Sequence, residues 1–133
     1  MTRPNPPKAV LEHVNITVSD PAKTAEMARQ LFGWHIRWEG PSMDGAGYTI
    51  HVGTDDSYVA VYSQGSPKAA GISRYDQKAG LNHVGIVVDD IDATEAAVRE
   101  FGITPHNHAD YEPGRRFYFE DHDGVEWEVV SYS

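Results

Sequence analysis

The chain has 133 residues and no cysteine, and its 20 acidic and 11 basic residues give a formal net charge of -9. A chain of this length can bury one core, whereas half of it, about 65 residues, would be marginally stable alone. The acidic balance argues against nucleic acid and anionic membranes as partners, and no apolar stretch is long enough to cross a bilayer. We therefore expect a soluble cytoplasmic protein, in which any metal is bound by His, Asp or Glu side chains.

The sequence of residues 11–30 returns, in part, at residues 81–100. The identical pairs are Leu11/Leu81, His13/His83, Val14/Val84, Ile16/Ile86, Val18/Val88, Asp20/Asp90, Thr24/Thr94 and Arg29/Arg99. Chance would give about one identity over such a stretch. The chain is therefore interpreted as two copies of one module. A pseudo-twofold arrangement of the copies would bring their first histidines to one place.

The first copy, residues 9–62, follows a proline-rich segment, residues 1–8, that we expect to be an extended tail. Residues 9–18 alternate between apolar and polar side chains, which predicts a strand. A helix is predicted over residues 21–32, because Pro21 suits a first turn and Gly33 can end it. The apolar runs that follow predict three strands, at residues 35–39, 48–52 and 58–62.

The second copy, residues 81–133, repeats this order after a linker at residues 63–80 that is rich in Gly, Ser, Ala and Lys. Its predicted helix covers residues 91–101, and its later strands are predicted at residues 104–107, 116–120 and 126–132. Each module therefore has the order βαβββ. We expect an α+β fold in which the two modules form a cupped mixed sheet with the helices on its convex face.

Side-chain parity separates the core face of each first strand from the opposite face. Val14 and Ile16, with their repeats in the second copy, are expected to pack on the helices. His13, Asn15 and His83 then face the concave side of the sheet.

The last strand adds a carboxylate to this concave face. Trp127 and Val129 are expected to pack outward, so that Glu128 points inward, whereas Glu126 is expected to point away from the site. Ala60 stands at the position in the first module that matches Glu128. The pseudo-symmetric site therefore has three protein ligands rather than four.

Two histidines and one carboxylate suit octahedral divalent cations and leave coordination positions open to substrate, water or dioxygen. We therefore predict that His13, His83 and Glu128 bind a metal ion. The alternative is that the histidines are ordinary core residues and that Glu128 lies at a solvated edge. The coincidence of all three at inward, repeat-related positions favours the metal.

Other inward side chains are candidates for catalysis and substrate binding. Tyr118 is the candidate proton or hydrogen-bond donor, with a strand tyrosine at the cavity rim as its alternative. Arg116 can clamp a substrate carboxylate or simply be solvated. Asn15, Tyr62 and Tyr132 are expected to line the cavity.

The repeated openings at residues 11–20 and 81–90, and the segment Phe-Tyr-Phe-Glu-Asp-His-Asp-Gly-Val-Glu-Trp-Glu-Val at residues 117–129, resemble the vicinal oxygen chelate superfamily. This superfamily contains glyoxalases, fosfomycin-resistance enzymes, bleomycin-resistance proteins and extradiol dioxygenases. The similarity covers residues 9–132. In the closing motif, His122 replaces the usual proline and Trp127 the usual aliphatic residue. The resemblance implies a divalent metal (Fe, Mn, Ni or Zn) that chelates two adjacent oxygens of a small-molecule substrate.

The resemblance leaves the reaction open. Ala60 argues against the four-ligand site of glyoxalase I, and residues 106–114 lack the Lys and Ser of the fosfomycin-resistance loop. Tyr118 matches a tyrosine of the extradiol dioxygenases. We expect dioxygenase-like or glyoxalase-like lyase or isomerase chemistry, and the alternative is a non-catalytic protein that binds a small molecule such as an antibiotic. The resemblance also implies a homodimer, in which His13 of one chain can join His83 and Glu128 of the other.

Overall fold

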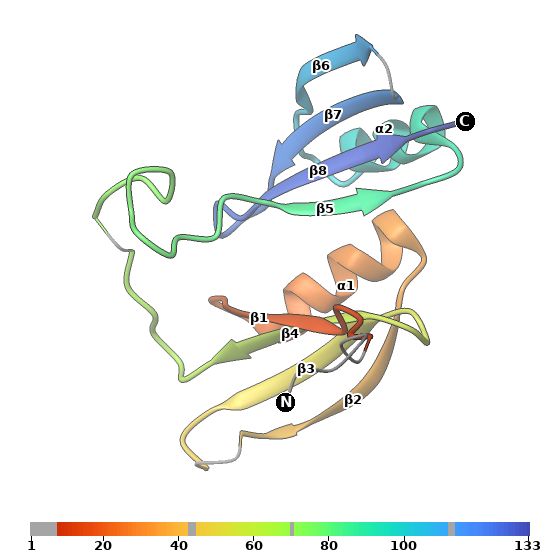
Figure 1. Cartoon of the computed structure of the whole chain (residues 1–133). Helices are drawn as coiled ribbons and strands as arrows, with labels where there is room; N and C mark the ends of the chain where they lie inside the picture. Colours follow the sequence, from red (N-terminus) through yellow and green to blue (C-terminus); the bar gives the residue numbers. More distant parts are fainter. Residues whose placement is uncertain (1–7, 43–44, 70, 112–113) are drawn as a thin grey trace, which may run out of the picture.

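The computed structural model describes residues 8–42, 45–69, 71–111 and 114–133. Each half of the chain forms one βαβββ module (Figure 1). Module one contains β1 (His13–Thr17), α1 (Pro21–Phe32), β2 (His35–Pro41), β3 (Tyr48–Gly53) and β4 (Tyr58–Ser63). Module two contains β5 (Val84–Val87), α2 (Ile91–Glu100), β6 (His106–Tyr111), β7 (Gly114–Glu120) and β8 (Glu126–Ser131).

The two modules share one sheet topology. Module one has the strand order β1-β4-β3-β2, and module two has the equivalent order β5-β8-β7-β6. The first strand of each module pairs in parallel with the last, and the other neighbours are antiparallel. Each module thus forms its own four-stranded mixed sheet, and the predicted α+β fold with a repeated module is confirmed.

Both helices begin at an aspartate cap. The carboxylate of Asp20 accepts hydrogen bonds from the backbone at the start of α1, and that of Asp90 does the same for α2. These contacts satisfy amide groups that a helix start leaves without an intrahelical partner. Gly33 ends α1 in the left-handed conformation, with φ 69°. The predicted helix at residues 21–32 is therefore confirmed, and the one at 91–101 ends one residue earlier, at Glu100.

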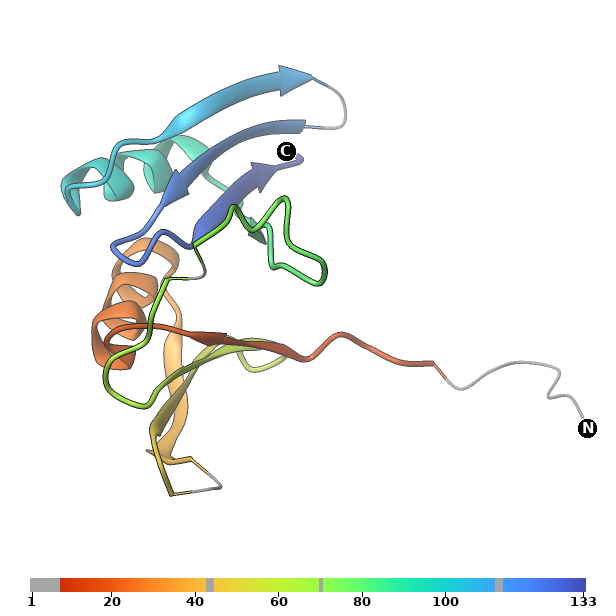
Figure 2. The same ribbon diagram turned by 90° about the vertical axis from the view of Figure 1, so that its left-hand side faces the viewer.

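The core lies between the helices and the sheets. Its largest fully buried side chains include Trp127, Phe117, Phe119 and Met27. α1 also packs against α2, so the two modules share this core. Val14, Ile16 and their repeats pack against it from the first strands, as side-chain parity predicted. Figure 2 shows both helices towards one side of the molecule and the turn before β5 on the other side of β8.

The observed bounds of β1 and β6 differ from the predicted ones, because each strand extends only as far as it pairs with its neighbouring strand. β1 begins at His13 rather than residue 9, because its ladder with β4 begins at the pair His13 and Tyr58. β6 covers His106–Tyr111 rather than residues 104–107, and its register with β7 shifts beside Asn107, which has a φ of 54°. The tail expected at residues 1–8 lies, except for Lys8, outside the described residues. No helix in the described ranges is long and apolar enough to span a membrane.

Candidate functional site

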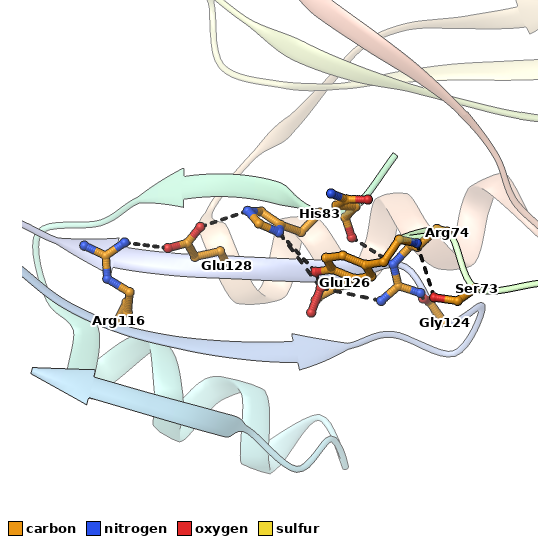
Figure 3. Close-up of polar contacts among 9 residues, drawn as sticks. Ser73, Arg74, His83, Arg116, Gly124, Glu126 and Glu128 are labelled. Carbon is orange, nitrogen blue, oxygen red and sulfur yellow. Dashed lines mark hydrogen bonds and ion pairs between the residues drawn. The ribbon is translucent and has the colours of Figure 1, made fainter. Parts of the chain in front are cut away.

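Module two brings three predicted site residues together on the face opposite the core (Figure 3). His83 Nε2 lies 3.1 Å from Glu128 Oε1. The other carboxylate oxygen accepts a hydrogen bond of 2.8 Å from Arg116 Nη1. The side chains of Glu128 and Arg116 are only 12% and 15% exposed. A carboxylate this buried needs such partners, because removal from water penalises an isolated charge.

Strand register explains the cluster. β8 lies between β5 and β7, and Glu128 pairs with Tyr118 on one side and with Gly85 on the other. The His83 ring meets the Tyr118 ring edge to face, with the ring centroids 5.6 Å apart. Tyr118 therefore lies beside the His83–Glu128 pair, where the sequence predicted it.

The expectation that Glu126 points away from the site is wrong. Side chains alternate along a strand, so Glu126 shares the face of Glu128. Glu126 Oε1 lies 3.9 Å from His83 Nδ1 and accepts a hydrogen bond from the Tyr75 hydroxyl. This hydrogen bond raises the pKa of Tyr75. Arg74 Nη2 lies 3.6 Å from the same carboxylate oxygen.

His13 makes its contacts within module one. Its Nδ1 lies 2.8 Å from Glu12 Oε1, and its ring stacks on Tyr58 with centroids 4.8 Å apart. Tyr58 also stacks on His51, at 4.5 Å. Burial lowers the pKa of His51, and the nearby charges of His13 and Arg37 lower it further.

The single chain does not assemble the predicted ligand set. In the part of the chain that the structure describes, no three His, Asp or Glu side chains are placed to hold a metal ion. His83 and Glu128 form one pair, and His13 lies apart from that pair. His13 and His83 nevertheless line one cavity of about 450 Å³, which also contains residues of β1 and β5.

A second cavity, of about 780 Å³, opens on the face of module one away from the core. It is lined by Asn15, Thr17, Trp38, Pro41, Ser42, Thr49, His51 and Tyr62. Asn15 and Tyr62 thus line a cavity on module one, whose lining does not include His13, His83 or Glu128. Tyr132 lies after β8, is 60% exposed and is not part of this lining.

The register also identifies the module-one counterparts of the cluster. Ala60 pairs with Asn15 and His51, just as Glu128 pairs with Gly85 and Tyr118. Ala60 therefore occupies the position equivalent to Glu128, and module one has no carboxylate there. The counterpart of Tyr118 is His51, which lines the cavity on module one.

Solved structures share this fold. The structure of SMU.1112c is 24% identical and has a TM-score of 0.75, with 92% of this chain and 98% of that chain covered. A glyoxylase/bleomycin resistance protein/dioxygenase domain from Frankia sp. EAN1pec is 15% identical, with a TM-score of 0.79 and coverages of 96% and 94%. The fosfomycin resistance protein FosX from Listeria monocytogenes, complexed with Mn(II) and sulfate, is 14% identical, with a TM-score of 0.71 and coverages of 95% and 94%.

Among curated proteins, no sequence matches this chain. The family profile of the Glyoxalase/Bleomycin resistance protein/Dioxygenase superfamily matches residues 10–129. This range covers both modules up to residue 129 in β8, and it includes the aspartate caps and the His83–Glu128 pair. The protein therefore belongs to the glyoxalase/bleomycin resistance protein/dioxygenase superfamily, also called the vicinal oxygen chelate superfamily.

Proposed function

We propose that this protein is a metal-dependent enzyme that acts on a small molecule with two adjacent oxygens. In this proposal His83 and Glu128 hold a divalent cation (Fe, Mn, Ni or Zn) together with His13 of the partner subunit. The supporting observation is the 3.1 Å separation of His83 Nε2 and Glu128 Oε1. Two donors that each lie about 2.1 Å from one ion, at right angles, are about 3.0 Å apart. Two imidazoles and one carboxylate also suit these cations.

A homodimer supplies the third ligand in this proposal. Among the described strands, β1 and β5 each pair with one neighbour, so each leaves an open edge beside its histidine. Natural proteins pair or cover such edges. Large apolar side chains stand exposed along the two strands and the segments before them: Val10, Leu11, Leu81 and Val87. A second copy that covers these edges would bring its own His13 towards His83 and Glu128.

The substrate occupies the concave faces in this proposal. The cavity on module one falls in the size range of small-molecule sites. Asn15 offers an amide there, and Tyr62 offers ring surface. Tyr132 is a further proposed contact, made at the cavity mouth of the assembled dimer.

The bound cation would act as a Lewis acid on the two chelated oxygens. Tyr118, beside His83, is proposed as the proton or hydrogen-bond donor to the substrate. Arg116 is bound to Glu128 and so holds the carboxylate in place. Arg116 is also proposed to contact the substrate, because a guanidinium is a donor that matches carboxylate oxygens. The reaction is proposed to be dioxygenase-like or glyoxalase-like lyase or isomerase chemistry.

Metal retention tests this proposal. Protein loaded with Mn or Zn and then dialysed should retain stoichiometric metal by elemental analysis, and Glu128→Ala should retain none. Glu100→Ala is the matched control, because Glu100 is exposed at the end of α2. The proposal fails if the wild-type protein retains no metal, or if the two variants behave alike. If the wild-type protein retains metal, a turnover screen with catechols, 2-oxoaldehyde thiol adducts and phosphonates would identify the reaction.

A binding protein without turnover is the second candidate function. Arg116 and His83 already contact both oxygens of Glu128, so the carboxylate is paired without a metal. The module-one cavity also offers Trp38 and Tyr62 as flat surfaces for an aromatic ligand. Ligand binding by a metal-free protein, with no turnover, would favour this candidate.

A further inference from the structure

The segment before β5 is anchored to module two by one arginine. Arg74 Nε donates a hydrogen bond of 2.8 Å to the backbone oxygen of Asn82, and Arg74 Nη1 donates one of 3.2 Å to that of Gly124 (Figure 3). These two carbonyl groups belong to the segments that lead into β5 and β8. Arg74 therefore fixes the turn that contains its neighbour, Tyr75, beside the start of both strands.

Tyr75 and Arg74 both contact the buried carboxylate of Glu126, through a hydrogen bond and an ion pair respectively. Glu126 is only 7% exposed, and it accepts a hydrogen bond from the Tyr75 hydroxyl. A buried carboxylate on the inner face contributes nothing to the apolar core, and its burial requires these partners. Glu126 also lies on the Nδ1 side of the His83 ring, whereas Glu128 lies on the Nε2 side.

The direction of these hydrogen bonds determines how the imidazole is presented. A tyrosine hydroxyl has one hydrogen, and Tyr75 donates it to Glu126. Towards His83 Nδ1, 3.5 Å away, the Tyr75 oxygen therefore acts as an acceptor. A hydrogen bond at this contact therefore requires a hydrogen on His83 Nδ1. Without a metal ion, the 3.1 Å contact between Nε2 and the Glu128 carboxylate also requires a hydrogen on Nε2, and a cation bound to Nε2 would take the place of that hydrogen.

We propose that Tyr75 and Glu126 are positioning residues that hold the His83 ring through its Nδ1–H and direct its Nε2 to the point shared with Glu128. This inference rests on the proposed function where it concerns metal binding. Outer hydrogen-bond partners of a metal-binding histidine set its tautomer and ring orientation, and losing one typically weakens metal binding by about 10–100-fold. Neither residue touches the proposed cation.

Two variants and one control test the inference. Tyr75→Phe removes the acceptor at His83 Nδ1, and Glu126→Gln removes the carboxylate that orients the tyrosine. The matched control is Tyr48→Phe, because the Tyr48 hydroxyl also donates to a glutamate, Glu39, at 2.8 Å in module one. Calorimetric titration with Mn²⁺ should give a Kd about 10–100-fold higher for the two variants, and an unchanged Kd for the control.

A metal-free measurement separates this inference from the proposed function. Proton NMR of the metal-free protein should show a His83 Nδ1–H that exchanges slowly with solvent in the wild-type protein and in Tyr48→Phe. Tyr75→Phe should exchange this hydrogen faster, because its ring offers no acceptor. If the wild-type protein binds no metal, the proposed function fails, and the exchange result alone decides the inference.

The inference is overturned if Tyr75→Phe leaves the exchange of the His83 Nδ1 hydrogen unchanged. It is also overturned if wild-type protein binds Mn²⁺ and both variants bind it equally well. Glu126→Gln alters a buried group, so its fold must be checked by circular dichroism. Tyr75 is 55% exposed, so Tyr75→Phe should fold like the wild-type protein. The inference can therefore be tested with Tyr75→Phe alone if Glu126→Gln does not fold.

Discussion

At the scale of single residues, the inner face of module two holds two buried carboxylates, and each has a positively charged side chain beside it. Glu126 and Glu128 lie on one face of one strand, and two such anions would repel each other without partners. Each has its own arginine: Arg74 lies beside Glu126, and Arg116 binds Glu128. The His83 ring lies between the two carboxylates. The face can therefore hold its acidic groups in fixed positions, as a ligand site requires.

His51 predicts how stability depends on pH. Its pKa is lowered in the folded protein, so below the ordinary value of 6.5 the unfolded chain binds the proton more readily than the folded chain. Stability should therefore fall as pH is lowered from about 7 through this window. Urea unfolding of metal-free protein should show a smaller fall for His51→Gln. The control His35→Gln removes a histidine whose side chain is 56% exposed, and it should keep the wild-type fall. Equal slopes for wild-type protein and His51→Gln would contradict the prediction.

At the scale of elements, β8 serves the core with one face and the site with the other. Trp127 points into the core at 1% exposure, and its ring lies 5.5 Å from that of Phe32 at the end of α1. Its indole nitrogen donates a hydrogen bond of 3.1 Å to the Asp121 carboxylate. This tryptophan therefore joins the modules and fixes the strand on which Glu128 stands.

Replacing this side chain should show its contribution. Trp127→Phe leaves a void and removes the donor to a buried carboxylate, so we expect a loss of about 2–4 kcal/mol in the free energy of unfolding. Trp38→Phe is the control, because Trp38 is 50% exposed and its change should stay within about 0.5 kcal/mol. Urea denaturation measures both. Equal unfolding free energies for the two variants would show that Trp127 does not stabilise the shared core.

Periodicity made much of this arrangement predictable from the sequence. The repeat predicted equivalent modules, and parity placed His83, Tyr118 and Glu128 on one face. The same parity rule applies to Glu126, whose position two residues before Glu128 fixes its face. Arg74 and Tyr75 could not be predicted, because they lie in a turn without periodicity and reach the site only through tertiary contacts.

At the scale of the whole molecule, β1 and β5 present open sheet edges. Each module has a buried core face, but within the described residues the first strand of each module pairs with one neighbouring strand. The proposed metal ligands are likewise divided between the modules, with His13 on module one and His83 with Glu128 on module two. One contact between two copies could therefore cover both edges and complete two equivalent sites.

A mixing experiment tests whether the site is shared between subunits. His13→Ala and Glu128→Ala chains should each bind no metal alone. If His13 acts across the dimer, a mixed dimer contains one intact site, made by His13 of the Glu128→Ala chain with His83 and Glu128 of the other chain. Equal amounts, unfolded and refolded together, should recover about one quarter of the wild-type metal by elemental analysis. A site within one chain would recover none, because each chain lacks one ligand. Light scattering should find dimers in every sample, and monomers in the wild-type sample would contradict the shared site directly.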